Sequence, residues 1–315
     1  MTVTTPFGRF STAAEVLAGV DLGGRRAVIT GGGAGLGLAT ARALAIAGAE
    51  VTLAVRDLDR GAWAAAALVT ETRNPRVVAA PLDLADQRSV ARFAEEWHGP
   101  LHILVNNGGG IVRTLQRTPE GWERQFAVHH LGHFALAHAL HGALAAAKGA
   151  RIVTVSSSGH LASPVVFDDI HFAYRPYQDV IAYGQSKTAN ILFGVEAGRR
   201  WAADGITANA AAPGPVLTGF QRNMDPERLR GRLGGREWRE GEVPDGWKSA
   251  EQGVATFVLL AASPLTAELT GRYFEDCAEA ERVDHGGDYS HGVAPFALDP
   301  ANAARLWTES LRLLG

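Results

Sequence analysis

Residues 25–37, Arg25-Arg26-Ala27-Val28-Ile29-Thr30-Gly31-Gly32-Gly33-Ala34-Gly35-Leu36-Gly37, decide the fold. The apolar run within residues 25–30 predicts a short buried strand, and apolar residues on one face from Leu36 to about Ala47 predict a helix. Glycines between a strand and a helix let the backbone approach a pyrophosphate, whose charge the helix N-terminus meets. The stretch therefore favours a dinucleotide-binding unit with Gly31, Gly33, Gly35 and Leu36 at the cofactor. A glycine-rich turn without a ligand is the alternative.

Strand and helix patterns alternate along the rest of the chain. Further strands are predicted at 50–55, 76–81, 101–105, 151–155, 207–212 and 271–274, and helices at 59–72, 88–97, 119–141, 181–203, 251–262 and 300–314. This alternation predicts an α/β fold: a single-domain, doubly wound parallel sheet (Rossmann fold) with helices on both faces.

The predicted domain covers residues 25–315, and residues 1–24 form a leader, with a short helix at 11–18, that lies against its body. The segment at about 219–249 is charged and weakly periodic, and we expect a substrate-side insertion there. It is either a mobile lid over the site or a surface insertion.

The composition of the chain limits which partners and which cellular setting are expected. The chain has 315 residues, of which 46% are hydrophobic, and its 30 basic and 33 acidic side chains nearly cancel. Without a Lys/Arg run, nucleic acid is not an expected partner, and a small neutral or lipophilic molecule fits better. Cys277 is the only cysteine, which excludes an intramolecular disulfide. Because no apolar run reaches the length of a membrane span, we expect a soluble, cytoplasmic protein.

The segment Tyr183-Gly184-Gln185-Ser186-Lys187 places a phenol and an ammonium four residues apart on one face of a predicted helix. A nearby cation favours phenolate, so Tyr183 is a candidate acid and base at an alcohol or carbonyl oxygen. A chance pair of solvated side chains is the alternative.

Several strand ends carry candidate cofactor contacts. Arg56 follows the second strand, where an arginine meets the 2′-phosphate of NADP and an acid would meet the ribose of NAD. We therefore predict NADP, with NAD as the alternative; an exposed Arg in a turn is the other interpretation. Asp83, which Leu84 follows, either bonds the adenine or caps a helix. The last candidates are Asn107, Gly108 and Gly109 after the fourth strand, and Pro213, Gly214, Val216 and Thr218 after the sixth.

Histidines and serines complete the candidate set. His129 and His133 have the i, i+4 spacing of a zinc pair, but no glutamate of an HExxH motif lies between them, so helix packing is favoured and no metal is predicted. Ser156-Ser157-Ser158 ends the strand at 151–155, where a hydroxyl can bond a substrate oxygen or form a turn. Residues 159–180, which include Phe167 and Phe172, are expected to line a pocket.

Together these motifs resemble the short-chain dehydrogenase/reductase family: Thr30-Gly31-x3-Gly35-x-Gly37, Asn106-Asn107-Gly108-Gly109, Ser156-Ser157, Tyr183-x3-Lys187 and Pro213-Gly214. The likeness covers about residues 20–280. Within the family, the retinol-dehydrogenase-like and WW-domain-oxidoreductase-like branch is indicated by three further segments: His130-Leu131-Gly132-His133-Phe134, Tyr183 to Asn190, and Gly271-Arg272-Tyr273-Phe274-Glu275-Asp276-Cys277.

The resemblance implies roles for these residues. Ser157 orients the substrate oxygen, Tyr183 transfers the proton, and Lys187 holds the nicotinamide ribose and lowers the phenol pKa. Thr218 bonds the carboxamide. One departure is His129, which stands where the family has a fourth catalytic residue, an asparagine. An imidazole is bulkier and titrates near neutrality, so it either preserves the proton relay with an altered pH dependence, shrinks the pocket or marks lost activity.

The function expected from all this is an NADP(H)-dependent oxidoreductase that interconverts an alcohol and a ketone or aldehyde of a fairly apolar small molecule. A non-catalytic sensor of nicotinamide dinucleotide is the alternative, and lyase or epimerase chemistry on the same scaffold is a third interpretation. The resemblance also implies a homodimer or homotetramer built on the two long helices ending near His141 and Ala203, although the branch contains monomers.

Overall fold

The computed structural model describes residues 2–219, 221, 224–237, 242–284 and 290–315. Within these residues an eight-stranded sheet runs through the centre of the molecule in the order β3-β2-β1-β4-β5-β6-β7-β8. All neighbouring pairs are parallel except β7 and β8. The strands are β1 (Arg26–Thr30), β2 (Glu50–Val55), β3 (Val77–Pro81), β4 (Ile103–Asn106), β5 (Arg151–Val155), β6 (Thr207–Ala211), β7 (Tyr273–Glu275) and β8 (Ala278–Glu279).

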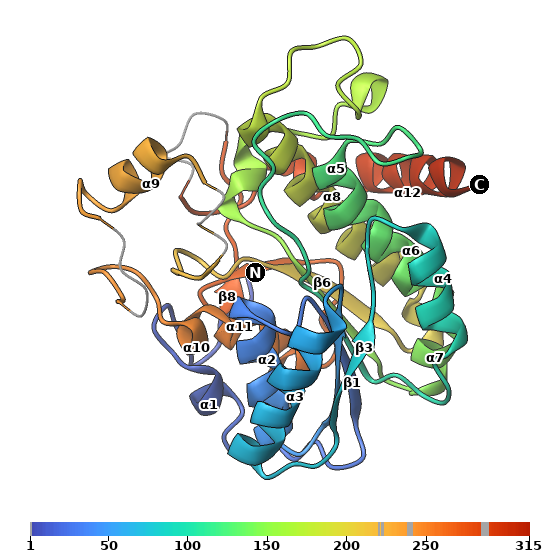
Figure 1. Ribbon diagram of the computed structural model, residues 1–315, viewed down its shortest axis with the longest axis vertical. Coiled ribbons are helices and arrows are strands. Elements are labelled where there is room, and N and C mark those ends of the chain that lie inside the picture. The colour runs from blue at the N-terminus through green and yellow to red at the C-terminus, as the bar shows by residue number, and fades with distance from the viewer. Residues whose placement is uncertain (1, 220, 222–223, 238–241, 285–289) are drawn as a thin grey trace.

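Helices cover both faces of this sheet (Figure 1). One layer contains α2 (Gly35–Ile46), α3 (Leu58–Thr72) and α11 (Ala255–Ala262), and the other contains α4 (Gln87–Glu95), α6 (Gly132–Ala139), α7 (His141–Ala146) and α8 (Asp179–Arg200). Each layer has its own apolar core, one around Leu44 and Phe257 and the other around Phe134 and Phe193. The predicted fold class is confirmed. The strand order reverses between β1 and β4, and in such sheets ligands bind at the carboxyl ends of the strands there.

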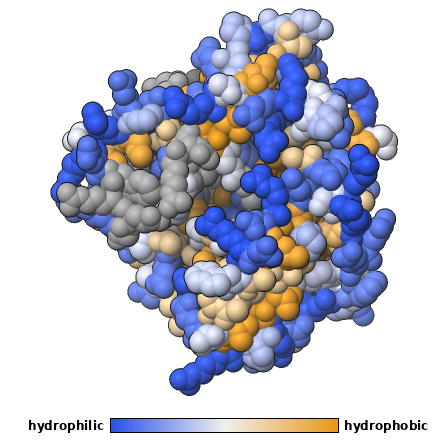
Figure 2. Space-filling model, in the orientation of Figure 1, coloured by the Kyte–Doolittle hydropathy of each residue, from blue (hydrophilic) through white to orange (hydrophobic). Residues whose placement is uncertain are grey.

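The helices of the first layer turn small residues inward. The buried residues of α3 are Gly61, Ala64, Ala65 and Leu68, while Trp63 on the same helix is 76% exposed. Figure 2 shows apolar side chains gathered on the surface over α2 and α3. Alanines and glycines allow a helix to lie close to the sheet, which explains why the large side chain faces outward.

The leader packs against this layer. Its helix, α1 (Ala13–Val16), is shorter than predicted and begins with a capping box in which Thr12 and Glu15 bond each other's backbone. Ala13 and Val16 are buried in the first core, and the Thr5 hydroxyl donates to the Cys277 carbonyl at 2.7 Å. These contacts agree with a leader held on the body, although the division into leader and domain stays a prediction.

The helix predicted for residues 119–141 differs in the structure. Pro119 lies in a turn, and the helical path begins with α5 (Arg124–Phe126), continues through a π-helical turn (Ala127–Leu131) into α6, and breaks at Leu140 before α7. The start is set by Glu123, whose buried carboxylate accepts the Gln125 and Phe126 amides at 2.9 and 2.7 Å. A buried cap therefore outweighs the preference of proline for a first helical turn.

Smaller differences concern the C-terminal third. The helix predicted at 251–262 is divided at Val254 into α10 (Ala250–Gly253) and α11, and α9 (Pro226–Arg232) and the two-residue β8 were not predicted. Residues 220, 222–223 and 238–241 of the predicted insertion lie outside the described residues. In the described part of the chain, no helix has the length and apolar character that a membrane span needs.

The C-terminal helix α12 (Pro300–Leu314) covers α6 and α8. Trp307 is buried, stacks 6.2 Å from the Phe193 ring and meets the Phe134 ring edge-on at 4.8 Å. The Ser310 hydroxyl bonds His130 Nε2 at 2.7 Å. The four-helix interface expected from the resemblance would need this same face. Because the chain's own helix packs there, we expect no association through α6 and α8, and the oligomeric state itself stays a prediction.

Candidate active site

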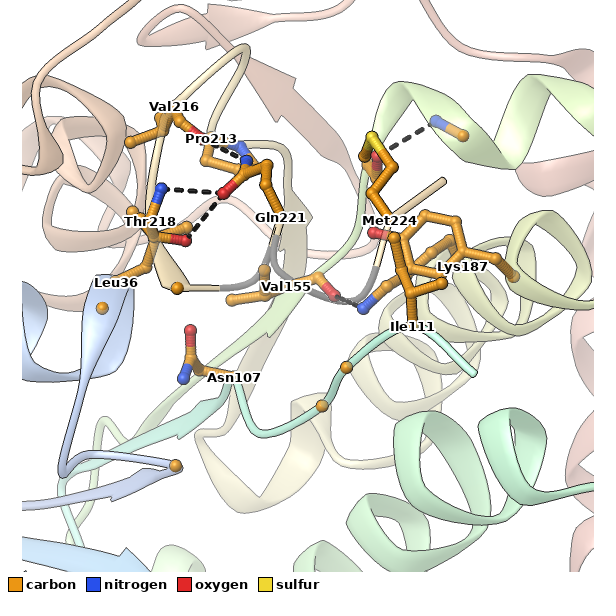
Figure 3. Close-up of a pocket in the computed structure, with 18 of the residues that line it drawn as sticks. Leu36, Asn107, Ile111, Val155, Lys187, Pro213, Val216, Thr218, Gln221 and Met224 are labelled. Carbon is orange, nitrogen blue, oxygen red and sulfur yellow. Dashed lines mark hydrogen bonds between the residues drawn. The ribbon is translucent and has the colours of Figure 1, made fainter. Parts of the chain in front are cut away.

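A cavity of about 450 Å³ lies at the carboxyl ends of β1, β4, β5 and β6 (Figure 3). Most of the predicted site residues line it, although they are scattered through the sequence. They are Gly31, Gly35, Leu36, Asn107, Gly108, Gly109, Ser157, Tyr183, Lys187, Pro213, Gly214, Val216 and Thr218. The parallel sheet brings them together because it places the ends of all these strands on one edge.

The remaining predicted residues lie outside the cavity wall. Gly33, Arg56, Asp83, Leu84 and His129 are not among the lining residues. Asp83 accepts the Ala85 amide at 2.9 Å, which matches the local capping alternative, although α4 itself is capped by Asp86. The Leu84 side chain supports the loop after β4, since a Cβ on Gly108 would lie 2.8 Å from Leu84 Cδ1.

The basic residue that reaches the cavity from α3 is Arg60, which the sequence reasoning missed. Arg56, the predicted residue, is exposed at the end of β2. Asp57 caps α3 by accepting the Arg60 amide at 3.1 Å, so Arg60 stands in the first turn. The spacing from the end of β2 was the available signal, because a first-turn residue of the following helix faces the same edge of the sheet.

The glycine-rich turn is packed tightly against the loop after β4. A Cβ on Gly37 would contact the Gly31 carbonyl and would lie 2.7 Å from Asn107 Nδ2. Asn107 Nδ2 in turn donates to the Thr30 carbonyl at 2.8 Å. Only glycine leaves room for the backbone to close up here, which keeps the start of α2 open toward a phosphate.

His133 fixes this loop from behind. Its Nδ1 donates to the His129 carbonyl at 2.9 Å, so Nε2 accepts the Thr30 hydroxyl at 2.8 Å. The Thr30 oxygen accepts the amides of Asn107 and Gly108, both at 2.8 Å. Burial lowers the pKa of His133 to about 4, which keeps the imidazole neutral as this pattern requires. This histidine therefore has a structural partner on each nitrogen rather than a metal.

Tyr183, Lys187 and Ser157 meet on one wall of the cavity. Lys187 Nζ lies 5.5 Å from the centre of the Tyr183 ring and donates to the Val155 carbonyl at 3.1 Å (Figure 3). Ser157 Oγ accepts the Gly159 amide at 3.0 Å and is hydrogen-bonded to the Tyr183 phenol. Ser156, by contrast, is buried and donates to the Lys187 carbonyl at 2.8 Å. Both serines line the cavity, but the Ser157 hydroxyl meets the Tyr183 phenol, whereas the Ser156 hydroxyl is used to support α8.

The charges on this wall differ from the prediction. Burial raises the pKa of Tyr183 to about 12, against a smaller lowering by Ser157 and Arg232. Burial also lowers the pKa of Lys187 to about 7. The expected lowering of the phenol pKa by Lys187 is not seen, because enclosure disfavours both the phenolate and the ammonium. The phenol is therefore in its protonated, proton-donating form at neutral pH.

His129 lies behind the cavity and not in it. Its Nε2 accepts the Gly110 amide at 3.1 Å, so its Nδ1 donates to Ser186 Oγ at 2.8 Å. The ring meets the Tyr183 ring at a right angle, 5.7 Å between centres. Burial holds its pKa well below the usual value, so titration near neutrality was a wrong expectation. This geometry gives His129 a positioning role between the loop after β4 and α8.

The connection at 159–180 lines the cavity only near its ends, through Gly159, Asp179 and Val180, whereas its apolar middle, residues 165–177, does not form the expected substrate wall. None of these middle residues lines the cavity; Val165 and Phe172 are buried in a core cluster and against Tyr177 respectively, while Tyr174 is 89% exposed. The insertion forms this wall instead. Its lining residues, which the sequence did not indicate individually, are Gly219, Gln221, Met224, Arg228, Arg232 and Trp247.

The insertion is attached at both ends. Arg113, after β4, bonds Asp225 at 2.8 Å, and Asp225 caps α9. On the returning side, the Lys248 amide donates to the Pro215 carbonyl at 2.8 Å and Arg9 donates to the Gly246 carbonyl at 2.9 Å. Figure 1 shows α9 standing apart from both helical layers. The insertion thus closes one end of the cavity.

The sheet order, the glycine turn and the Ser157, Tyr183 and Lys187 arrangement define a nucleotide-binding oxidoreductase, and the family model for short chain dehydrogenases matches residues 25–229. The chain therefore belongs to the short-chain dehydrogenase family. It is 54% identical to a protein of Streptomyces lividans named "Probable oxidoreductase" over 91% of this chain and 97% of that protein. It is 36% identical to mouse retinol dehydrogenase 12 over 98% and 92% of the two chains. The predicted family and branch are confirmed.

A solved structure agrees with this assignment. The gluconate 5-dehydrogenase of Burkholderia cenocepacia, in complex with NADP and tartrate, superposes with a TM-score of 0.63 at 26% identity, covering 81% of this chain and 94% of that one. The sensor alternative receives no support from these proteins, whose names describe dehydrogenases and oxidoreductases.

Proposed function

We propose that the protein is an NADP(H)-dependent dehydrogenase or reductase that interconverts an alcohol and a ketone or aldehyde. The observation that carries the proposal is the convergence of Ser157, Tyr183 and Lys187 on the cavity that the glycine turn also lines. The residues fit the cofactor, because the turn presents backbone without side chains to the cavity at Gly31 and Gly35 and is packed too tightly at Gly37 to admit a Cβ. The NADP complex of the Burkholderia relative supports the same choice of cofactor.

In this proposal the glycine turn and the start of α2 hold the pyrophosphate, Lys187 holds the nicotinamide ribose, and Thr218 bonds the carboxamide. Arg60 and Arg56 are the cations available for a 2′-phosphate. NADPH supplies a hydride to the substrate carbon when it is bound. Ser157 orients the substrate oxygen, and the protonated phenol of Tyr183 donates a proton to that oxygen during reduction.

The body of the substrate meets apolar side chains in the cavity wall. Ile111 and Met224 line the cavity (Figure 3), as does Val180. They supply the apolar contacts first expected from residues 165–177 and support a carbonyl compound with an apolar body.

The test is substitution of Tyr183 by Phe. NADPH oxidation with a panel of aldehydes and ketones should fall by about a hundredfold or more, the usual contribution of a positioned acid. NADPH affinity, followed by fluorescence, should stay within about twofold. Tyr174→Phe is the matched control, because Tyr174 is 89% exposed and away from the cavity wall. Unchanged turnover in Tyr183→Phe would refute the proposed acid.

A further inference from the structure

Two arginines on one helix face the reacting end of the cavity. Arg228 and Arg232 are four residues apart on α9, so they share a helix face, and both line the cavity. Arg232 lies close enough to Tyr183 for each to change the pKa of the other. The arginines therefore belong to the substrate side of the cavity.

The rest of the site supports this placement. Met224, which precedes α9, lies beside Lys187 and Ile111, whereas Leu36 and Asn107 lie toward the opposite end (Figure 3). That opposite end contains the glycine turn and Arg60, the residues suited to the cofactor's phosphates. Arg60 thus borders one end of the cavity, and Arg228 and Arg232 border the other.

Neither arginine has an acidic partner within ion-pair distance in the part of the chain that the structure describes. Partial enclosure and the like charge of Arg228 lower the pKa of Arg232. Asp179 is the only acid among the described lining residues, and its Oδ1 accepts the Val180 amide at the start of α8. Both side chains line the cavity while remaining largely exposed to solvent, and two neighbouring guanidinium groups without an acidic partner form a receptor for an anion.

Resting on the proposed function, we propose that the substrate carries an anionic group, a carboxylate or a phosphate, which Arg228 and Arg232 bind while its carbonyl reaches Tyr183. The apolar contacts of Ile111 and Val180 then hold the part between the two ends. The salt bridge of Arg113 with Asp225 keeps α9 in place and leaves the two arginines available to the substrate. Specificity is thereby assigned to the insertion rather than to the segment after β5.

The test uses two aldehydes with the same reacting group, 4-carboxybenzaldehyde and its neutral methyl ester. Wild type should reduce the carboxylate with the higher kcat/KM. Arg228→Gln and Arg232→Gln should each lower kcat/KM for the carboxylate by about ten- to a hundredfold, the usual effect of one charge-assisted hydrogen bond, and change it little for the ester. Arg230→Gln, on the same helix but away from the cavity wall, should change neither. Equal losses for both aldehydes, or no loss, would overturn the proposal.

A binding measurement keeps this question separate from catalysis. Calorimetry of the NADP-loaded protein with 4-(hydroxymethyl)benzoate should show binding that both glutamine variants weaken, even if no aldehyde is turned over. Absence of turnover with this binding intact would count against the proposed reaction and for the anion site. Weaker NADPH binding in Arg228→Gln and Arg232→Gln, with the aldehyde preference unchanged, would assign the arginines to the cofactor and overturn the proposal.

Discussion

Replacing Gly109 by Ala should show how tightly His129 holds the loop after β4. The added Cβ would lie 2.5 Å from His129 Cδ2 and 2.6 Å from His129 Nε2, and the His129 side chain is buried. Alanine suits the backbone at this position, because Gly109 does not have a positive φ. The cost therefore comes from the contact with the imidazole alone.

The magnitude follows from that contact. Overpacking of this kind costs roughly 1–3 kcal/mol, and a loop displaced by it also loses the Gly110 amide bond to His129, about 1 kcal/mol more. For a chain of this length, 2 kcal/mol corresponds to a fall in Tm of about 3 °C. In a His129→Ala background the ring atoms are gone, so Gly109→Ala should cost less than about 1 kcal/mol.

The assay is a double-mutant cycle in urea or by thermal unfolding, with the single and double variants measured at pH 7.5. Gly110→Ala is the control in the same loop, because a Cβ on Gly110 would have no atom within 4 Å. It should change the free energy of unfolding by less than about 0.5 kcal/mol. If Gly109→Ala costs the same with and without the imidazole, the positioning role of His129 is refuted.

Other consequences can be measured directly. The pKa of Tyr183, about 12, keeps the phenol protonated at neutral pH, so alcohol oxidation should accelerate from pH 7 to 10 while carbonyl reduction should not; the reverse order would contradict this. Burial lowers the pKa of His130 to about 3 and of His133 and His160 to about 4. The unfolded chain then takes up protons first, so stability should fall by up to about 1.4 kcal/mol per histidine for each pH unit below 6.5, as urea titrations at pH 7 and 5 will test. Trp307→Ala should lower stability by about 3–5 kcal/mol and expose the α6 and α8 face, so sedimentation should show a monomer for wild type and self-association for the variant; a stable wild-type dimer through that face would contradict our interpretation.

The sequence by itself determined the sheet and the glycine turn at one end of the cavity. The apolar run before Gly31 and the glycines after it predict a buried strand followed by a tight turn into a helix, and the structure has both elements. The placement of Tyr183 and Lys187 is likewise local, because residues four positions apart on a helix lie on the same face. These features were predictable because each depends on neighbours within one turn or one strand.

Only the tertiary structure decided the surroundings of those residues. Whether the phenol pKa falls or rises depends on how far Tyr183 and Lys187 are enclosed, which no local spacing reports. The hydrogen bond of His129 with Gly110 and the proximity of Arg232 to Tyr183 likewise join residues that are distant in the chain. Local patterns specify backbone geometry, whereas electrostatic environment and substrate contacts come from segments that meet only when the chain has folded.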